Sequence, residues 1–163
     1  MGRSELLLVL GALILFGLTR LATNRYMVDQ NESIIQREYE FYAISLAQSF
    51  IEEGKTKAYD VAVINASPPV PSGFTGNGGL GPAAGEFYPN FNDIDDYNGL
   101  SLTDSTSRGD FDVDIVVGYV KETTPEIIEV SQKTFYKKMI VTISNPYLIQ
   151  PVQLDYIFSY FGN

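Results

Sequence analysis

The 163-residue chain contains neither cysteine nor histidine. These absences exclude thiolate and imidazole zinc sites, cysteine nucleophiles, Ser-His-Asp triads and acid–base catalysis by imidazole. They also exclude disulfides, so cysteine usage gives no information about the compartment. An enzyme built from this chain would depend on carboxylates, lysine and tyrosine alone. We therefore expect no enzymatic activity, no cofactor and no bound metal.

Positive charge is also scarce, with 11 Lys and Arg against 20 Asp and Glu and a net charge of −9. Nucleic-acid binding requires basic surfaces that displace counterions, so we expect no nucleic-acid partner. The deficit is uneven, because residues 1–57 hold six basic and seven acidic side chains whereas residues 58–163 hold five and 13. The chain is therefore expected to consist of two unlike parts.

Charge is absent altogether from residues 6–18, which are all apolar or glycine. A bilayer core takes about 20 residues of helix, and this run reaches that length only if Arg20 snorkels and the helix extends to Ala22 or Thr23. The run fits a signal peptide, a short signal anchor or a helix that packs in a bundle. Residues 18–24 form a poor small-residue cleavage site, which argues against a signal peptide.

The helical pattern continues beyond the apolar run. No proline occurs between residues 6 and 53, and Gly54 stands where a glycine would end a helix. We predict one helix over residues 1–54, apolar in 1–23 and amphipathic in 24–54. Its apolar stripe has spacings of 4, 3, 4 and 4 residues and consists of Ile35, Tyr39, Tyr42, Leu46 and Phe50.

Glu5 is the one charged residue directly before the apolar run. A carboxylate at the head of an apolar helix is costly in lipid and is a candidate functional residue. Alternatively, Glu5 lies in the first helical turn only because the positive end of the helix dipole favours an acid there.

The remaining residues, 55–163, are expected to form a β-rich head. Residues 66–90 contain six Gly and five Pro, which predicts a long loop without regular elements. Thr123-Thr124-Pro125 and Asn145-Pro146 are turn signals. Alternating apolar residues predict three strands. In each strand, every second residue lies on the same face. These residues are Phe111, Val113, Ile115, Val117 and Tyr119 in the first strand, Phe135, Lys137, Met139, Val141 and Ile143 in the second, and Val152, Leu154, Tyr156, Phe158 and Tyr160 in the third.

The predicted fold class is α+β. The amphipathic half of the helix covers an antiparallel sheet of three to four strands. The stripe from Ile35 to Phe50 supplies the helix-to-sheet contacts. We also expect Lys137 and Lys138 to face the aspartates of the first strand, Asp112 and Asp114, across the sheet.

Acidic residues gather between positions 93 and 114. Within this stretch, residues 91–99 could hold calcium, since hard cations bind several carboxylates. However, placing Gly99 at the sixth position of an EF-hand loop puts Ile94 at the first, so a solvated turn with Asn98-Gly99 in type I′ geometry is favoured. Because Arg108 is the only cation there, we expect the whole stretch and the 66–90 loop to face solvent.

An apolar N-terminal helix with Glu5, continuing as an amphipathic spine into a β-rich domain, resembles the type IV pilins and the related pseudopilins of type II secretion. The Asp-Asp-Tyr-Asn-Gly sequence at residues 95–99 also resembles a loop found in bacterial pilin-like proteins. The resemblance implies that a prepilin peptidase removes a leader, absent from this sequence, and that Met1 becomes the N-methylated first residue. It also implies that the Glu5 carboxylate pairs with the α-amino group of Met1 in a neighbouring subunit.

The same resemblance implies a function. The subunit is anchored in the inner membrane with its N-terminus cytoplasmic and its head outside, and the assembly machinery then builds it into an extracellular filament of identical copies. Two alternatives remain open: a pseudopilin that forms a short periplasmic fibre, and a monomeric periplasmic binding domain with a single membrane anchor. The residues expected to pack in the filament core are Leu6, Leu7, Leu8, Val9, Leu10, Leu13, Ile14, Leu15, Phe16 and Leu18.

Overall fold

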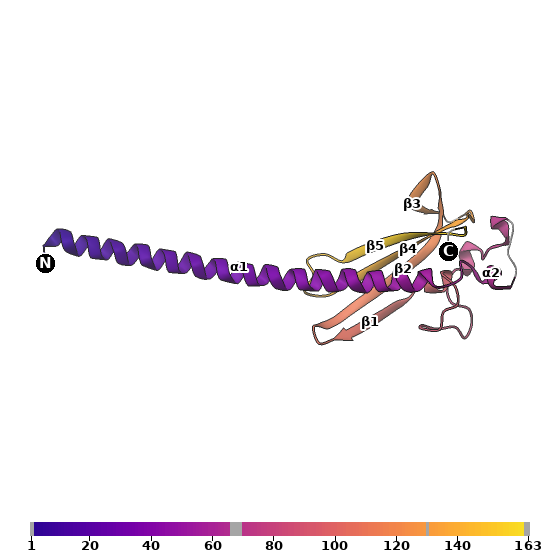
Figure 1. Cartoon of the computed structure of the whole chain (residues 1–163), viewed down its shortest axis with the longest axis horizontal. Coiled ribbons are helices and arrows are strands. Elements are labelled where there is room, and N and C mark those ends of the chain that lie inside the picture. Colours follow the sequence, from indigo (N-terminus) through magenta and orange to yellow (C-terminus); the bar gives the residue numbers. More distant parts are fainter. Residues whose placement is uncertain (1, 66–69, 130, 162–163) are drawn as a thin grey trace. The chain divides into compact units, whose positions relative to one another are not determined.

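The structure is a computed structural model that describes residues 2–65, 70–129 and 131–161. Contacts between residues divide the chain into two compact units, Met1–Tyr39 and Glu40–Asn163. Helix α1 (Arg3–Lys55) makes up the described part of the first unit and is also the first element of the second unit (Figure 1). The single long helix expected from the unbroken, proline-free pattern is therefore present.

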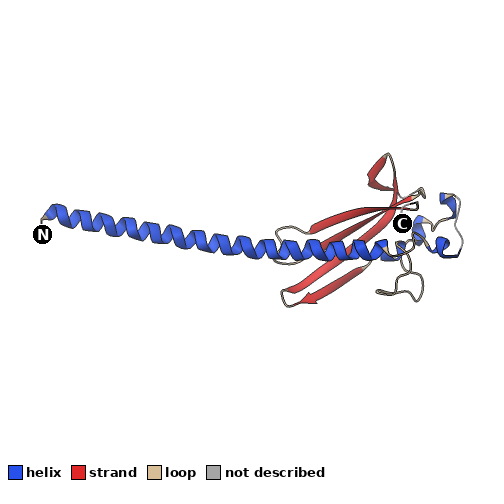
Figure 2. Cartoon of the chain, in the orientation of Figure 1, coloured by secondary structure: helices blue, strands red, loops and turns tan. Residues whose placement is uncertain are grey.

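The second unit is built on one antiparallel sheet of five strands, coloured red in Figure 2. The strands are β1 (Ser101–Thr106), β2 (Gly109–Lys121), β3 (Thr124–Glu129), β4 (Tyr136–Ser144) and β5 (Val152–Ser159). The order is β1-β2-β4-β5, and β3 pairs with the last residues of β2. The α+β class with a helix on an antiparallel sheet is confirmed.

Two of these strands, β1 and β3, go beyond the three predicted from alternation. β1 has the sequence Ser-Leu-Thr-Asp-Ser-Thr and contains a single large apolar residue, so its pattern gives no strand signal. For β3, Thr123-Thr124-Pro125 was predicted to be a turn, and no strand was predicted directly after it. A proline is tolerated at the start of an edge strand, where its missing N–H breaks no ladder, and β3 pairs only with β2.

The alternation predicted for the central strands is confirmed by burial. In β2 every second residue from Phe111 to Tyr119 is buried, whereas Asp112 and Asp114 between them are exposed. The register places Val117 opposite Met139 and Tyr119 opposite Lys137. The apolar faces of β2 and β4 therefore form the core of the second unit, and residues 40–55 of α1 cover it (Figure 1).

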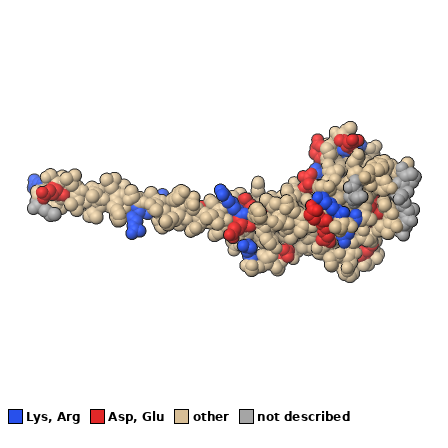
Figure 3. Space-filling model, in the orientation of Figure 1, with Lys and Arg blue, Asp and Glu red and all other residues tan. Residues whose placement is uncertain are grey.

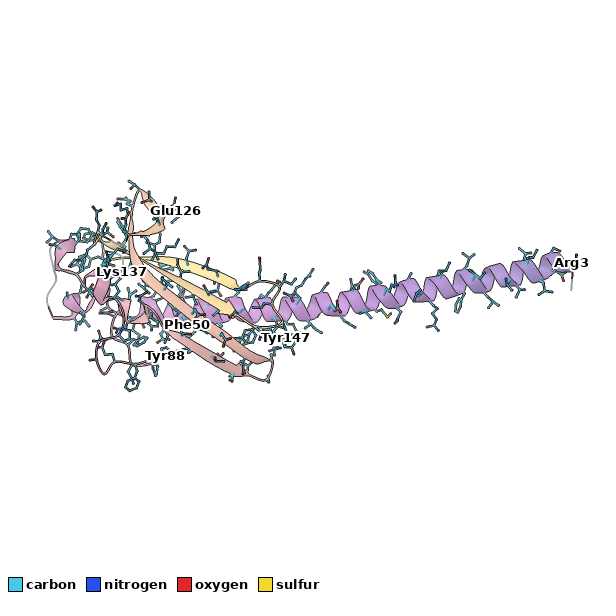
Figure 4. All side chains as sticks on the ribbon, turned by 180° about the vertical axis from the view of Figure 1, so that it is seen from behind. Arg3, Phe50, Tyr88, Glu126, Lys137 and Tyr147 are labelled. Carbon is cyan, nitrogen blue, oxygen red and sulfur yellow. The ribbon has the colours of Figure 1, made fainter. Side chains whose placement is uncertain are left out.

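The contact between α1 and the sheet uses small residues as well as large ones. Phe50 is buried and lies near Tyr88, with ring centroids 5.8 Å apart (Figure 4). The Tyr42 ring packs on Phe111 at 4.6 Å between centroids. The helix residues that are buried are Ala43, Ala47, Phe50, Ile51 and Gly54.

Gly54 has a different role from the one expected. It does not end the helix, since α1 continues to Lys55. A Cβ atom at this position would lie 3.1 Å from Phe158 Cζ and 3.2 Å from Met139 Cε. Its missing side chain therefore lets the last turn of α1 approach β4 and β5 closely.

The connection between α1 and the sheet contains only short elements among the residues described. These are α2 (Val61–Asn65) and three 3₁₀ turns, η1 (Pro71–Gly73), η2 (Asn77–Gly79) and η3 (Asp95–Tyr97). The glycine- and proline-rich loop thus has little regular structure, as predicted. Its residues 66–69 lie outside the described part of the chain.

Candidate functional site

The first candidate site is the apolar surface of α1 in the first unit. The residues expected to pack in a filament core are all exposed in this chain, and Leu8 leaves 74% of its surface accessible. Figure 3 shows this surface as a tan stretch beyond the charged N-terminal end of the helix. By its length and composition, α1 is long and apolar enough to cross a membrane. Such a surface requires lipid or protein around it.

The helix satisfies its own polar groups in this unit. The Thr19 hydroxyl donates to the Leu15 carbonyl at 3.1 Å, and the Thr23 hydroxyl donates to the Thr19 carbonyl at 2.9 Å. Hydroxyls bonded back to their own helix do not need water. The two threonines therefore allow the apolar surface to extend past residue 18.

Glu5 lies in the first turn of α1, where its Oε2 accepts a hydrogen bond of 3.0 Å from the backbone N–H of Gly2. This is the glutamate half of a capping box, which satisfies an otherwise unpaired donor at the start of the helix. Glu5 therefore stabilises the first turn of its own helix, which is the local alternative raised by the sequence. Met1, the proposed partner of Glu5 in a neighbouring subunit, lies outside the described residues.

Large apolar side chains on α1 stay exposed well beyond the length that a bilayer covers. A bilayer core takes about 20 helical residues. Yet Phe41 leaves 75% of its surface exposed and Ile44 is also exposed, although both belong to the second unit. Of the predicted helix-to-sheet residues, Phe50 is buried, Tyr39, Tyr42 and Leu46 are partly buried, and Ile35 is exposed.

The second candidate site is a buried ionic cluster around Lys137, labelled in Figure 4. The side chain of Lys137 is completely buried. Its Nζ donates to Asp95 Oδ1 at 2.5 Å, to Asp60 Oδ2 at 2.9 Å and to the Tyr59 carbonyl at 2.8 Å. It also lies 4.7 Å from the centroid of the Tyr59 ring. The cation therefore joins β4 to the segment after α1 and to η3.

This geometry corrects the expectation that Lys137 faces the aspartates of the first strand. Asp112 and Asp114 lie on the exposed face of β2, and Lys137 is on the buried face. Neighbouring residues in a strand point to opposite faces, so only one of the two adjacent lysines can face outward. Lys138 does so and pairs with Asp155 of β5 at 3.0 Å.

The expectation that residues 91–99 form a solvated turn is wrong for the three aspartates within them. Asp93, Asp95 and Asp96 each expose 3% of their surface or less. Backbone N–H groups compensate for part of this burial, because Asp93 Oδ1 accepts from the N–H of Asp95 at 2.9 Å and Asp96 Oδ2 accepts from the N–H of Asn92 at 2.9 Å. Later acids of the stretch, Asp110, Asp112 and Asp114, are exposed as predicted.

The turn that follows has a different type from the one predicted. Asn98 has φ −68° and ψ 120°, Gly99 has φ 82°, and the Leu100 N–H donates to the Tyr97 carbonyl at 3.1 Å. A type I′ turn needs positive φ at both central residues, whereas type II needs it only at the second. The turn is therefore type II, and Gly99 supplies the positive φ.

The carboxyls of the cluster have unlike proton affinities. Burial, the neighbouring Asp95 charge and a hydrogen bond to that side chain raise the pKa of Asp93 to about 8. Burial also raises the pKa of Asp96. Burial alone would raise the pKa of Asp60 too, but Lys137 and the N–H groups of Ala62 and Thr75 hold it below its usual value.

A small cavity of about 140 Å³ adjoins the cluster. Asp93, Asp95, Asp96 and Glu86 contribute to its wall, together with Thr75. Among the residues that the structure describes, no three acidic side chains are grouped so that they could hold a metal ion.

The sequence pattern did not reveal the cluster as a unit. Asp60 follows α1, Asp95 lies in η3 and Lys137 lies in β4, so nothing in their spacing links them. The one signal was a lysine on the apolar face of a predicted strand. Lysine in that position is almost never fully buried without a partner, so its place on the apolar face indicates that carboxylates lie nearby.

The chain was compared with models of protein families, with curated proteins and with solved structures, and it matches none of them. Its pilin-like architecture, a long apolar N-terminal helix with an antiparallel sheet packed on its later part, is therefore established by the fold alone.

Proposed function

We propose that this chain is the structural subunit of a type IV pilus, which polymerises through its N-terminal helix into an extracellular filament. Before assembly, the apolar helix anchors the subunit in the inner membrane with its N-terminus cytoplasmic. Other copies of the chain, a prepilin peptidase and the membrane assembly machinery are its partners.

One observation carries this proposal. Exposed apolar side chains continue along α1 as far as Phe41 and Ile44, past the length that a bilayer shields. A monomeric anchored domain would leave these side chains in water. In a bundle of identical helices they are buried by neighbouring copies, and each square ångström removed from water contributes about 25 cal/mol to cohesion. A pseudopilin fibre would use the same contacts and differs in length and location.

Phe41 provides the test of polymerisation. Phe41→Glu places a charge on the exposed helix face, where the proposed bundle would have to desolvate it. We expect filaments to disappear while membrane insertion and the melting temperature stay unchanged. Phe87→Glu is the matched control, since Phe87 is 64% exposed and lies in the loop rather than on α1. Normal filaments from the Phe41 variant would contradict the proposal.

Glu5 has a second, separable role in the proposal. Its carboxylate pairs with the α-amino group of Met1 in a neighbouring subunit and sets the axial register, since a buried carboxylate without a partner is very costly. Glu5→Ala should sharply reduce the filament yield, as counted by electron microscopy, and leave the head folded. Loss of only the hydrogen bond from the Gly2 N–H to the Glu5 carboxylate would cost about 1 kcal/mol of helix stability. A normal yield would limit Glu5 to capping.

A further inference from the structure

The buried cluster brings together the groups needed to form an amide bond between two side chains. Lys137 Nζ lies 2.5 Å from Asp95 Oδ1 and 2.9 Å from Asp60 Oδ2, and the lysine side chain is completely buried. Asp93 lies directly beside Asp95, and its Oδ1 accepts a hydrogen bond of 2.9 Å from the Asp95 backbone N–H. An amine, a carboxyl group and a second carboxyl beside it are thus held in contact away from solvent.

We propose that Lys137 and Asp95 condense into an intramolecular isopeptide bond, which makes this pair a self-modification site. The inference is independent of whether the chain forms filaments. It concerns only residues of the second unit, Glu40–Asn163.

Asp95 rather than Asp60 is the reacting carboxyl for two reasons. Asp95 is the nearer of the two to Lys137 Nζ, and it has Asp93 beside it as a proton donor. The oxygens of Asp60 are occupied by the Ala62 N–H, by the N–H and hydroxyl of Thr75 and by the Tyr119 hydroxyl. Asp60 therefore remains a carboxylate that holds the amine in position.

The reaction balances without an external reagent. The Lys137 ammonium passes one proton to the Asp95 carboxylate, and the freed amine attacks the Asp95 carboxyl carbon to form the N–C bond. Asp93 donates its proton to the departing hydroxyl, the C–O bond breaks, and water leaves with the electron pair. The nitrogen then returns one proton to Asp93. One amide and one water are produced, and nothing is oxidised or reduced.

The surroundings favour the amide over the ion pair. Keeping two ions out of water costs several kcal/mol per ion even in a relaxed protein interior, whereas an amide carries no net charge. The protonated form of Asp93 that the reaction needs is present at neutral pH, because burial and the Asp95 charge raise its pKa to about 8. The cavity of about 140 Å³, whose wall includes Asp93 and Asp95, is large enough to take up the released water molecule.

The mass of the purified full-length chain tests the proposal directly. We expect the folded protein to be lighter than its sequence by one water molecule, and a proteolytic digest to contain a branched peptide that joins Lys137 to Asp95. Lys137→Arg and Asp95→Ala should restore the full mass. Asp60→Asn should retain the loss of water if it folds, since Asp60 is not the reacting carboxyl.

Two further variants separate chemistry from structure. Asp95→Asn should lose one ammonia molecule in place of one water, because the amide nitrogen becomes the leaving group. Asp93→Asn retains an acceptor oxygen for the N–H groups of Asp95 and Asp96 but cannot donate the carboxylic proton, so the cross-linked fraction should fall. An unbranched Lys137 peptide from the folded native chain would overturn the proposal, as would a water loss that persists in Lys137→Arg.

Discussion

The apolar surface of α1 and the ionic cluster of the head depart from the usual distribution of side chains in opposite directions. In the first unit, large apolar residues such as Leu8 are exposed; in the second, Lys137 and Asp60 are completely buried. An exposed apolar surface indicates that something outside the chain must cover it. A buried charge indicates the opposite, since it persists only where the chain itself supplies the partner.

The two regions therefore differ in their partners. The ionic cluster is satisfied by contacts within the subunit, whereas the apolar surface of α1 is left to other molecules. The head completes its own interactions, as the three hydrogen bonds of Lys137 show. The described residues of the first unit have no buried side chain. The stability of the head and the assembly of the filament should therefore respond to different substitutions.

Removing residues 1–25 should give the largest effect. A chain that starts at Tyr26 lacks the apolar surface but keeps every buried residue of the second unit. We expect no filaments, a soluble monomer by light scattering, and a cooperative melting transition by circular dichroism. An aggregated or unfolded product would show that the apolar third belongs to the core of the head, and the contrast between the two units would fail.

Replacing Lys137 tests whether the buried ionic cluster stabilises the head. Lys137→Met removes the Lys137 nitrogen, and with it the amide proposed above, and leaves Asp60 and Asp95 buried as carboxylates without a partner. Breaking a buried pair in this way typically costs about 3–5 kcal/mol. Chemical denaturation monitored by circular dichroism would measure the loss. Lys138→Met is the adjacent control, because Lys138 pairs with Asp155, whose side chain is half-exposed, whereas both partners of Lys137 are buried. A pair that solvent reaches contributes about 0–1 kcal/mol. Equal losses in the two variants would contradict the special role of the buried cation.

The pH dependence of stability should show a smaller effect. As long as Asp95 is a free carboxylate, as it is in Lys137→Arg, burial and the Asp95 charge raise the pKa of Asp93 in the folded state to about 8, above its usual value of about 3.9. The folded chain therefore holds a proton that the unfolded chain releases, and the stability contributed by that proton is lost as pH rises through about 8. Asp60 has the opposite effect on the pH dependence of stability. Its pKa is lower in the folded chain than in the unfolded chain, so it stabilises the fold above its usual titration range, and this contribution is lost as the pH falls.

Asp93→Asn should remove the loss of stability that occurs as the pH rises toward about 8. Asparagine does not titrate, so denaturation midpoints measured between about pH 5 and 8 should become more nearly constant than those of the unmodified chain. Asp110→Asn is the control, since Asp110 is exposed, and it should keep the original slope. An unchanged slope in the Asp93 variant would assign the dependence to another group.

Elements with long and regular periodicity could be predicted from the amino-acid sequence. The unbroken proline-free run predicts α1, and strict alternation predicts β2, β4 and most of β5, because the burial of one face imposes the period on the residues. The resemblance in residues 1–54 also directed attention to Glu5 and the apolar surface. Edge strands such as β1 and β3 were missed, because they bury little and so carry little pattern.

The identity of the buried charges, and of the small residues in the helix–sheet contact, depends on how the elements pack together. Asp60, Asp95 and Lys137 are separated by tens of residues and meet only when the sheet forms. Likewise, Gly54 has the local signature of a helix end, yet its place in the last turn of α1 depends on Phe158 and Met139 across the interface. Local sequence reports the periodicity of burial, whereas a pairing between distant residues depends on the three-dimensional approach of their backbones.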